Sequence, residues 1–245
     1  MKSLKELYRI GYGPSSSHTM GPRAAAEQYL SRHPAAKRFK VTLYGSLAAT
    51  GRGHLTDWAI LDVIGKERCE IKWCAEIVLP YHPNGMMFQA INESGQVYDE
   101  WVVYSVGGGA LAEGGRSSNQ TPDIYELNHL NDIIKWCDDR GYSYWQFVEE
   151  FEESDIWDYL NEVWKVMRAA VERGLETEGV LPGGLNLRRK APHYFIKAQG
   201  YSANLQTRGL VFAYALAVTE ENASGGRIVT APTCGSCGVV PAVLY

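Results

Sequence analysis

A short polar loop near the N-terminus holds the residues of this sequence whose types and spacing are best suited to chemistry. Two Gly-Pro pairs, at Gly13-Pro14 and Gly21-Pro22, enclose three hydroxyls, an imidazole and a fourth hydroxyl: Ser15, Ser16, Ser17, His18 and Thr19. Placed before an expected helix over 23–30, such a loop can direct hydroxyls and free backbone amides at a carboxylate or phosphate. The alternative is a capped turn in which the serines only satisfy backbone groups. His18 suits a proton carrier or a neutral hydrogen-bond donor equally well.

A second glycine-rich polar loop, 51–57, precedes an expected helix over 58–64. Its glycines allow the backbone to approach a ligand, and His54 and Asp57 could supply acid and base groups. The structural alternative is that Thr56 or Asp57 is simply the N-cap of the following helix.

Two other segments are weaker candidates. In loop 81–85, Asn84 followed by glycine is a strong turn signal, so His82 needs more than proximity to be assigned a function. In segment 181–191, two glycines precede a basic cluster that includes Lys190. A cluster of this kind can bind a carboxylate, although a Lys/Arg run is more often a solvated face.

The last candidate, segment 222–238, combines small residues and hydroxyls with a Cys-x-x-Cys pair, Cys234 and Cys237. By itself such a pair suggests a redox site or half of a metal site. The other cysteines (Cys69, Cys74 and Cys137) show no matching second pair, so a four-ligand zinc site is not predicted. Five cysteines at irregular spacings in a chain with no export signal favour free thiols over a disulfide framework.

The loops must be positioned by two halves of different character. In the N-terminal half, residues 39–44 predict a strand closed by Gly45, and 86–91 with 97–106 predict a hairpin around Asn92–Gly95. This half is expected to be α/β or α+β.

From Thr121 onward the pattern is helical. Thr121 is expected to cap a helix with Pro122 at its first position, which ends before Gly141. Ser143 and Gln146 resemble a capping box, and apolar residues repeat at helical spacing over 160–171. The boundary is placed between Gly107 and Gln120, where the sequence is glycine-rich and polar.

Composition excludes several classes of function. The net charge of −4 provides no basic field for nucleic acid or acidic membrane. The N-terminus lacks the apolar core of a secretory signal, and the longest apolar run, Leu210–Val218, is about half a bilayer span. We therefore expect a cytoplasmic protein without nucleic-acid or membrane partners.

Taken together, these segments resemble one family, the iron–sulfur-dependent L-serine dehydratases, or L-serine ammonia-lyases. The loop 13–22 matches its N-terminal signature. The other matching pieces occur in the family's order: 54–57, 82–85, 107–109, 181–184, 189–191 and 222–244. The resemblance runs over essentially the whole chain, and the ordered set is far more specific than any single piece.

The resemblance implies an α+β protein, with an α/β sandwich-type β-domain over 1–115 and the first part of a mainly helical catalytic α-domain over 121–245. It implies a 4Fe–4S cluster in the full-length enzyme, with one iron open to L-serine as a Lewis acid. Hydroxide then leaves as the α-proton is removed, and the product becomes pyruvate and ammonia. Pyridoxal phosphate is not expected.

The sequence departs from the family pattern at its end, because the family's cluster cysteines are expected beyond Tyr245. We therefore expect no metal ligand in this chain, a truncated α-domain and no activity from the chain alone. The catalytic base is left open, with His18 as a candidate. The resemblance implies the following substrate-binding residues: Ser15, Ser16, Ser17, His18, Thr19, His54, Asp57, His82, Asn84, Lys190, Asn222, Thr230 and Thr233.

Two other functions remain possible from the sequence. One is a regulatory module that binds serine without catalysis through the glycine and serine loops. The other is a zinc or redox protein based on Cys234 and Cys237. A homodimer is possible, and the preference for serine over threonine follows only from the family, since one methyl group is a small steric difference.

Overall fold

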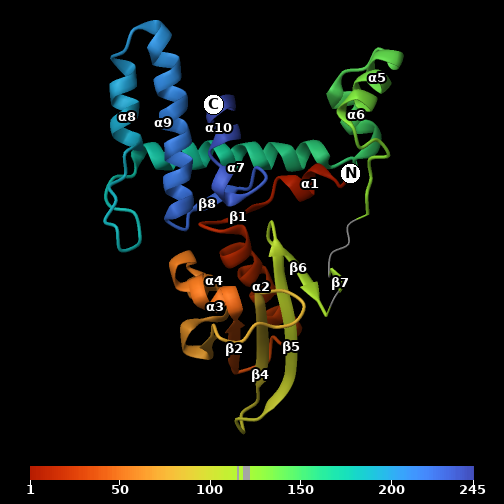
Figure 1. Ribbon diagram of the computed structural model, residues 1–245, viewed down its shortest axis with the longest axis vertical. Coiled ribbons are helices and arrows are strands. Elements are labelled where there is room, and N and C mark those ends of the chain that lie inside the picture. Colours follow the sequence, from red (N-terminus) through yellow and green to blue (C-terminus); the bar gives the residue numbers. More distant parts are fainter. Residues whose placement is uncertain (115, 118–121) are drawn as a thin grey trace.

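A six-stranded mixed sheet forms in the N-terminal half of the chain, in a computed structural model that describes residues 1–114, 116–117 and 122–245 (Figure 1). The strands lie in the order β3-β2-β4-β5-β6-β7. Only β2 and β3 run parallel; the other neighbours in this sheet are antiparallel. The strands are β2 (Arg38–Tyr44), β3 (Cys69–Cys74), β4 (Gly85–Ile91), β5 (Val97–Gly107), β6 (Ala110–Glu113) and β7 (Arg116–Ser117).

Two helices, α2 (Gly21–Arg32) and α4 (Thr56–Ile64), share the core of this sheet. Alternate residues of β2 point into that core, and Phe39, Val41 and Leu43 are buried. Tyr29 of α2 stacks on Trp101 of β5 with ring centroids 5.9 Å apart. Shorter helical segments connect these elements: Ser16–Met20, α3 (Gly45–Thr50), Gly51–His54 and Lys66–Arg68.

The sequence predictions for this half are confirmed. Strand 39–44 and the hairpin of 86–91 with 97–106 lie within one residue of their observed bounds. The helices expected over 23–30 and 58–64 both begin two residues earlier than predicted.

The remainder of the described chain is mainly helical. Its elements are α5 (Leu130–Arg140), α6 (Tyr144–Phe151), α7 (Ile156–Glu176), α8 (Ala191–Gln199), α9 (Ala203–Ala223), β8 (Arg227–Val229), Cys234–Ser236 and α10 (Val239–Leu244). Apolar residues of α7 recur at helical spacing and are buried: Val163, Val166, Met167, Ala170 and Val171. Figure 1 shows α7 lying across the molecule, with the sheet on one side and α8 and α9 rising on the other. No helix in the described ranges is both long and apolar enough to cross a bilayer.

One helix prediction was wrong. Residues 122–129 are not helical, and the helix begins at Leu130; Thr121 lies outside the described residues. The amides of Ile124 and Tyr125 both donate to the carbonyl of Met1, and the Tyr125 ring stacks on Phe147. These distant contacts outweigh the local preference for helix. The expected capping box holds, because the Ser143 amide donates to Gln146 Oε1 at 2.9 Å.

The first residues of the chain pack with the helical half. Strand β1 (Ile10–Tyr12) pairs antiparallel with β8, and Figure 1 shows the two side by side between the halves. Before it, the short helix α1 (Leu4–Leu7) is held by Glu152, which accepts from the Ser3 hydroxyl and the Leu4 amide. The division between 1–115 and 121–245 stays a prediction, to which the structure adds that residues 3–12 contact the helical half.

Gly174 lets α7 and α9 cross closely, and we predict that Gly174→Ala destabilises the protein. A Cβ there would lie 2.3 Å from the carbonyl oxygen of Ala217. Alanine gains about 1 kcal/mol of helix propensity, but the backbone clash should outweigh it and leave a net loss of about 2 kcal/mol. Urea denaturation measures the loss. Gly184→Ala is the control, because no atom lies within 4 Å of its Cβ position. An unchanged midpoint in Gly174→Ala would contradict the crossing geometry.

Candidate functional site

The serine-rich loop folds into a single π-helical turn, Ser16–Met20, with Ser15 as its N-cap. Ser15 Oγ accepts the His18 amide at 3.1 Å, and the Ser15 amide donates to Thr19 Oγ1 at 3.2 Å. Ser17 Oγ lies 2.9 Å from His18 Nδ1. Part of the loop therefore satisfies its own backbone, as the capped-turn alternative requires, while the hydroxyl of Ser17 contacts the imidazole.

The two loops with the strongest sequence signals meet at their histidines. The rings of His18 and His54 lie with centroids 4.8 Å apart and planes 40° apart. His54 Nδ1 is 3.0 Å from the carbonyl oxygen of Thr50. Because a carbonyl only accepts, Nδ1 carries a proton, and the neutral ring has its lone pair on Nε2.

His18 is bound through both ring nitrogens, since its Nε2 lies 3.1 Å from Ser46 Oγ. Hydroxyls donate or accept, so either tautomer of His18 fits these partners. Burial, and next the nearby His54, lower the pKa of His18 from its ordinary 6.5. His18 is therefore neutral at neutral pH.

Two threonines connect the loops through the histidine backbones. Thr19 Oγ1 donates to the carbonyl of His54 at 2.6 Å, and Thr56 Oγ1 donates to the carbonyl of His18 at 2.5 Å. Both threonines are completely buried. Asp57 accepts the amide of Trp58, which is a role at the start of α4.

The helical half contributes the end of α9 and the turn that follows it, residues 222–226. Asn222 Nδ2 donates to the Pro14 carbonyl at 3.2 Å, and the Gly13 amide donates to the Gly226 carbonyl at 3.1 Å. Asn222 is only 7% exposed, and its Oδ1 has no hydrogen-bond partner among the described residues. The C-terminal end of α9 therefore places a buried acceptor, Asn222 Oδ1, beside the loop that carries Ser15–Thr19.

Loop 81–85 contacts the site through the backbone of Ser46. His82 Nδ1 accepts the Asn84 amide at 3.1 Å, and Asn84 Nδ2 donates to the Ser105 carbonyl at 3.3 Å. The loop contacts the site through Pro83, whose carbonyl accepts the amide of Ser46 at 3.0 Å. His82 and Asn84 thus shape a loop that positions Ser46.

Other predicted residues have structural partners. Thr230 is buried, and its Oγ1 accepts the Arg9 amide at 3.0 Å, so it helps to join β1 and β8. Thr233 is exposed, and its Oγ1 lies 3.1 Å from Ser236 Oγ. Lys190 is exposed, and its amide donates to Glu220 Oε1 at the start of α8.

Within the basic cluster of 188–190, the charge of Arg189 is already paired. Arg189 Nη1 lies 2.9 Å from Glu221 Oε1, and Arg173 Nε lies 3.0 Å from Glu221 Oε2. Both partners of the first pair are largely buried, with side chains 7% and 9% exposed. Arg189 is therefore a structural cation, and a substrate carboxylate would have to compete with Glu221 for it.

Cys234 and Cys237 lie in the packing between the halves. Burial raises the pKa of each thiol to about 12, and Cys234 Sγ is 3.6 Å from Met20 Sδ. Metals take thiolates, and a 4Fe–4S cluster takes three or four of them. Within the described ranges, no three His, Cys, Asp or Glu side chains are arranged to hold a metal. The donor set of these residues does not fit a cluster.

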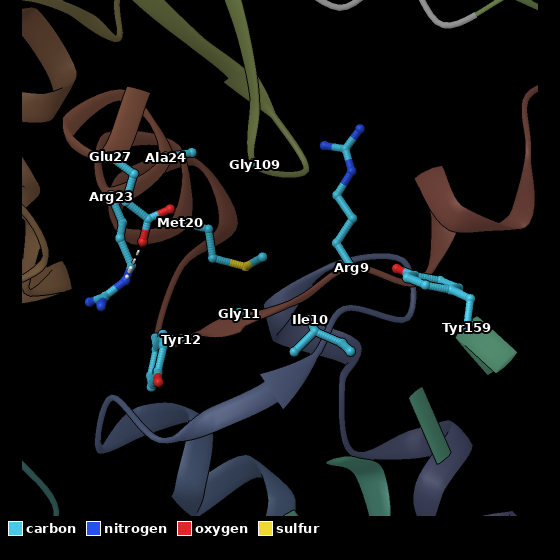
Figure 2. Close-up of a pocket in the computed structure, with 10 residues that line it drawn as sticks. All are labelled: Arg9, Ile10, Gly11, Tyr12, Met20, Arg23, Ala24, Glu27, Gly109 and Tyr159. Carbon is cyan, nitrogen blue, oxygen red and sulfur yellow. Dashed lines mark hydrogen bonds and ion pairs between the residues drawn. The ribbon is translucent and has the colours of Figure 1, made fainter. Parts of the chain in front are cut away.

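A cavity of about 410 Å³, lined in part by Met20, lies between β1, α2 and the turn at Gly109 (Figure 2). Its charged groups already have partners. Arg9 donates to the Gly108 carbonyl and pairs with Glu6. Arg23 Nε is 3.2 Å from Glu27 Oε1, and its Nη1 is 2.7 Å from Asp62 Oδ2. The charged side chains named here are therefore already paired, whereas Asn222 Oδ1 beside the serine loop is a buried acceptor without a partner among the described residues.

Two residues of the site were missed by the sequence prediction. Ser46 carries no motif signal, because its role depends on where β2 ends. Thr56 was weighed only as a helix cap, and its bond to the His18 carbonyl is formed between loops 38 residues apart.

Comparison with known proteins places these residues in a family context. A family model described as "Serine dehydratase alpha chain" matches residues 27–245. L-serine dehydratase 1 of Escherichia coli is 34% identical over the whole chain, as is L-serine dehydratase of Haemophilus influenzae. L-serine dehydratase of Streptomyces coelicolor is 33% identical over 99% of it. The chain spans 65%, 66% and 65% of the length of these three relatives, respectively.

We predict that Gly13→Ala separates the serine loop from the turn after α9. A Cβ at Gly13 would lie 2.2 Å from the Asn222 carbonyl oxygen and 2.3 Å from Asn222 Oδ1. The backbone has to move, at a cost of about 2 kcal/mol or more. Urea denaturation reports the cost. Gly53→Ala, with no atom within 4 Å of its Cβ position, should stay within about 0.5 kcal/mol of the parent protein. Equal effects of the two variants would refute the close contact.

We also predict that His18 makes the protein sensitive to acid. Because its pKa is lowered in the folded state, the unfolded chain binds the proton more readily, so stability is lost as pH falls below about 6.5 and through the folded pKa. The free energy of unfolding, measured at about pH 7.5 and about pH 5.5, should fall less in His18→Gln than in the parent protein. His129→Gln, at an exposed histidine before α5, is the control. The same acid loss in all three proteins would contradict the prediction.

Proposed function

We propose that this chain, which belongs to the serine dehydratase alpha chain family, provides the substrate-binding and proton-transfer part of an L-serine ammonia-lyase. The reaction is the conversion of L-serine to pyruvate and ammonia. The observation that carries the proposal is the close pair of His18 and His54, with the hydroxyls of the serine loop around His18 and the unsatisfied oxygen of Asn222 beside that loop.

Each group of L-serine has a complementary partner at this site. We assign the hydroxyl and carboxylate of the substrate to the hydroxyls of Ser17 and Ser46, which the His18 ring orients through its two nitrogens. Asn222 Oδ1 is a buried acceptor whose unsatisfied state is costly. An ammonium group is a donor that would satisfy it, so we assign the substrate amine to Asn222.

We assign removal of the α-proton to His54, although the sequence made His18 the candidate. The bond from His54 Nδ1 to Thr50 leaves the lone pair of Nε2 available as a base. His18 has both nitrogens bound by hydroxyls and a lowered pKa. His18 is therefore suited to orient the substrate and to stay neutral beside His54 as the latter takes up the proton.

The iron–sulfur cluster expected from the family is not matched by the donors of the described residues. We propose that its ligands belong to the third of the relatives' length that this chain does not span. The exposed apolar side chains of α8, α9 and α10 support a surface for that part. The most exposed on each helix are Ile196 (67%), Leu205 (56%) and Val243 (70%).

Fusion of the missing portion tests the function. The chain alone, reconstituted anaerobically with iron and sulfide, should bind no stoichiometric cluster and form no pyruvate from L-serine. A fusion that adds the portion of E. coli L-serine dehydratase 1 that this chain does not span should bind the cluster and form pyruvate. In that fusion, His54→Gln should lower kcat by a factor of about 10² to 10⁴, while His129→Gln should not.

The outcomes separate the alternatives. A fusion with a full cluster but no pyruvate, whose histidine NMR signals still respond to L-serine, would favour a serine-binding module. Full activity of His54→Gln would remove the base assignment but keep the lyase. Pyruvate from the chain alone would overturn the division of ligands.

A further inference from the structure

We propose that Thr19 and Thr56 form a reciprocal clamp between the two histidine loops, in which Thr56 is a positioning residue that holds His18 against His54. The proposal deepens the proposed function, because it explains how the histidine pair of that site is kept together. It assigns a role to Thr56 that its place at the start of α4 alone does not suggest.

The clamp is symmetrical in its connections. Each threonine follows one histidine by one or two residues and donates to the carbonyl of the other histidine. Thr19 reaches His54 at 2.6 Å, and Thr56 reaches His18 at 2.5 Å. Both side chains are fully buried, so water does not compete for these bonds and their loss leaves buried acceptors unsatisfied.

The local sequence explains why both carbonyls accept from a distant hydroxyl. In a continuing α-helix, the carbonyl of His18 would accept from the amide of residue 22, but that residue is proline and has none. The carbonyl of His54 would accept from Trp58, whose amide donates to Asp57 Oδ1 at 2.9 Å. The threonines supply donors at the two positions where the local backbone donor is missing or engaged.

The ring orientations depend on contacts within each histidine's own surroundings. Ser17 and Ser46 bind the His18 ring, and the Thr50 carbonyl binds the His54 ring. These bonds fix each ring relative to its neighbours but do not link the two loops. The threonine bonds join the two backbones directly and therefore set the distance between the rings.

The backbone between His54 and Thr56 supports the same conclusion. Leu55 adopts the left-handed conformation with φ of 57°, which is unfavourable for a leucine. This conformation turns the chain where the Thr56 hydroxyl bonds back toward the serine loop. The Leu55 side chain lies next to Gly225, with Cδ1 3.2 Å from the position of a Cβ there. The strained residue is thus held between the clamp and the turn after α9.

The titration of His18 reports on the distance to His54, because the charged side chains on the neighbouring elements have partners of their own. The Coulombic contribution to its lowered pKa comes from His54. From α4, Asp57 is bonded to the Trp58 amide, and from the short helix before it, Arg52 lies over the Trp73 ring. From α9, Glu221 is paired with two arginines. Ser17 and Ser46 carry no charge.

The test is an NMR titration of the histidine rings in the 245-residue chain, which requires neither cluster nor activity. Thr56→Val removes the hydroxyl at nearly constant shape. It should let the rings separate and raise the pKa of His18 toward its ordinary value by about half a pH unit. Thr56→Ser, which keeps the hydroxyl, should restore the parent value. Thr42→Val, the same change at a buried position of β2, is the matched control and should leave the titration unchanged.

A double variant shows whether the effect passes through His54. In a His54→Gln background, Thr56→Val should move the pKa of His18 much less than in the parent background. A Thr56→Val protein that is less stable but titrates like the parent would overturn the proposal and leave Thr56 a structural residue. If Thr56→Val does not fold, Thr56→Ala is titrated under the same criterion. Failure of the fusion enzyme to form pyruvate would refute the proposed function without altering this titration.

Discussion

The antiparallel pairing of β1 with β8 is the interaction on which the candidate site depends. Ile10 lies opposite Val229 and Tyr12 opposite Arg227, so residues more than 200 positions apart share one register. The serine loop begins immediately after β1, and the bond from the Gly13 amide to Gly226 continues the pairing into it. Closing so long a segment costs conformational entropy, which is offset by the burial of Met20 among Val218, Ile228 and Cys234. The two halves therefore meet through backbone bonds that leave little freedom at the loop.

The sequence predicts the helices and strands of this fold better than the contacts between distant elements. Alternation in β2 and the helical repeat of α7 are local patterns, and both elements form where expected. Strand β1 is three residues long and includes a glycine, so neither length nor composition marks it as a strand. Its pairing exists because β8 is present to accept it. The segment after Pro122 shows the opposite case, in which a local helix signal loses to the contacts of Met1 and Tyr125.

The site shows the same division between residue type and placement. The loop motifs single out His18 and His54, because each imidazole lies in a glycine-rich polar loop and can carry a proton or donate a hydrogen bond. Their supporting residues are not predictable in this way, since Ser46 and Thr56 act through single bonds to groups on other elements. Thr230 and Lys190 were expected at the substrate because they lie in family motifs. In the structure, Thr230 bonds β1 next to β8, and the amide of Lys190 bonds Glu220 at the start of α8. A motif thus identifies a segment in which some residues are candidates for chemistry and others stabilise the fold.

Docking of the halves also sets the electrostatics of the histidine pair. Two imidazoles with centroids 4.8 Å apart repel each other when both are charged, and the nearby His54 contributes to the lowered pKa of His18. Burial within the serine loop is the larger cause of the lowered pKa of His18, and the bond from His54 Nδ1 leaves a lone pair on His54 Nε2. That loop is held against the helical half by Gly13 and Asn222. Any loosening of the β1–β8 pairing would therefore change both the position of the His18 ring and the surroundings that lower its pKa.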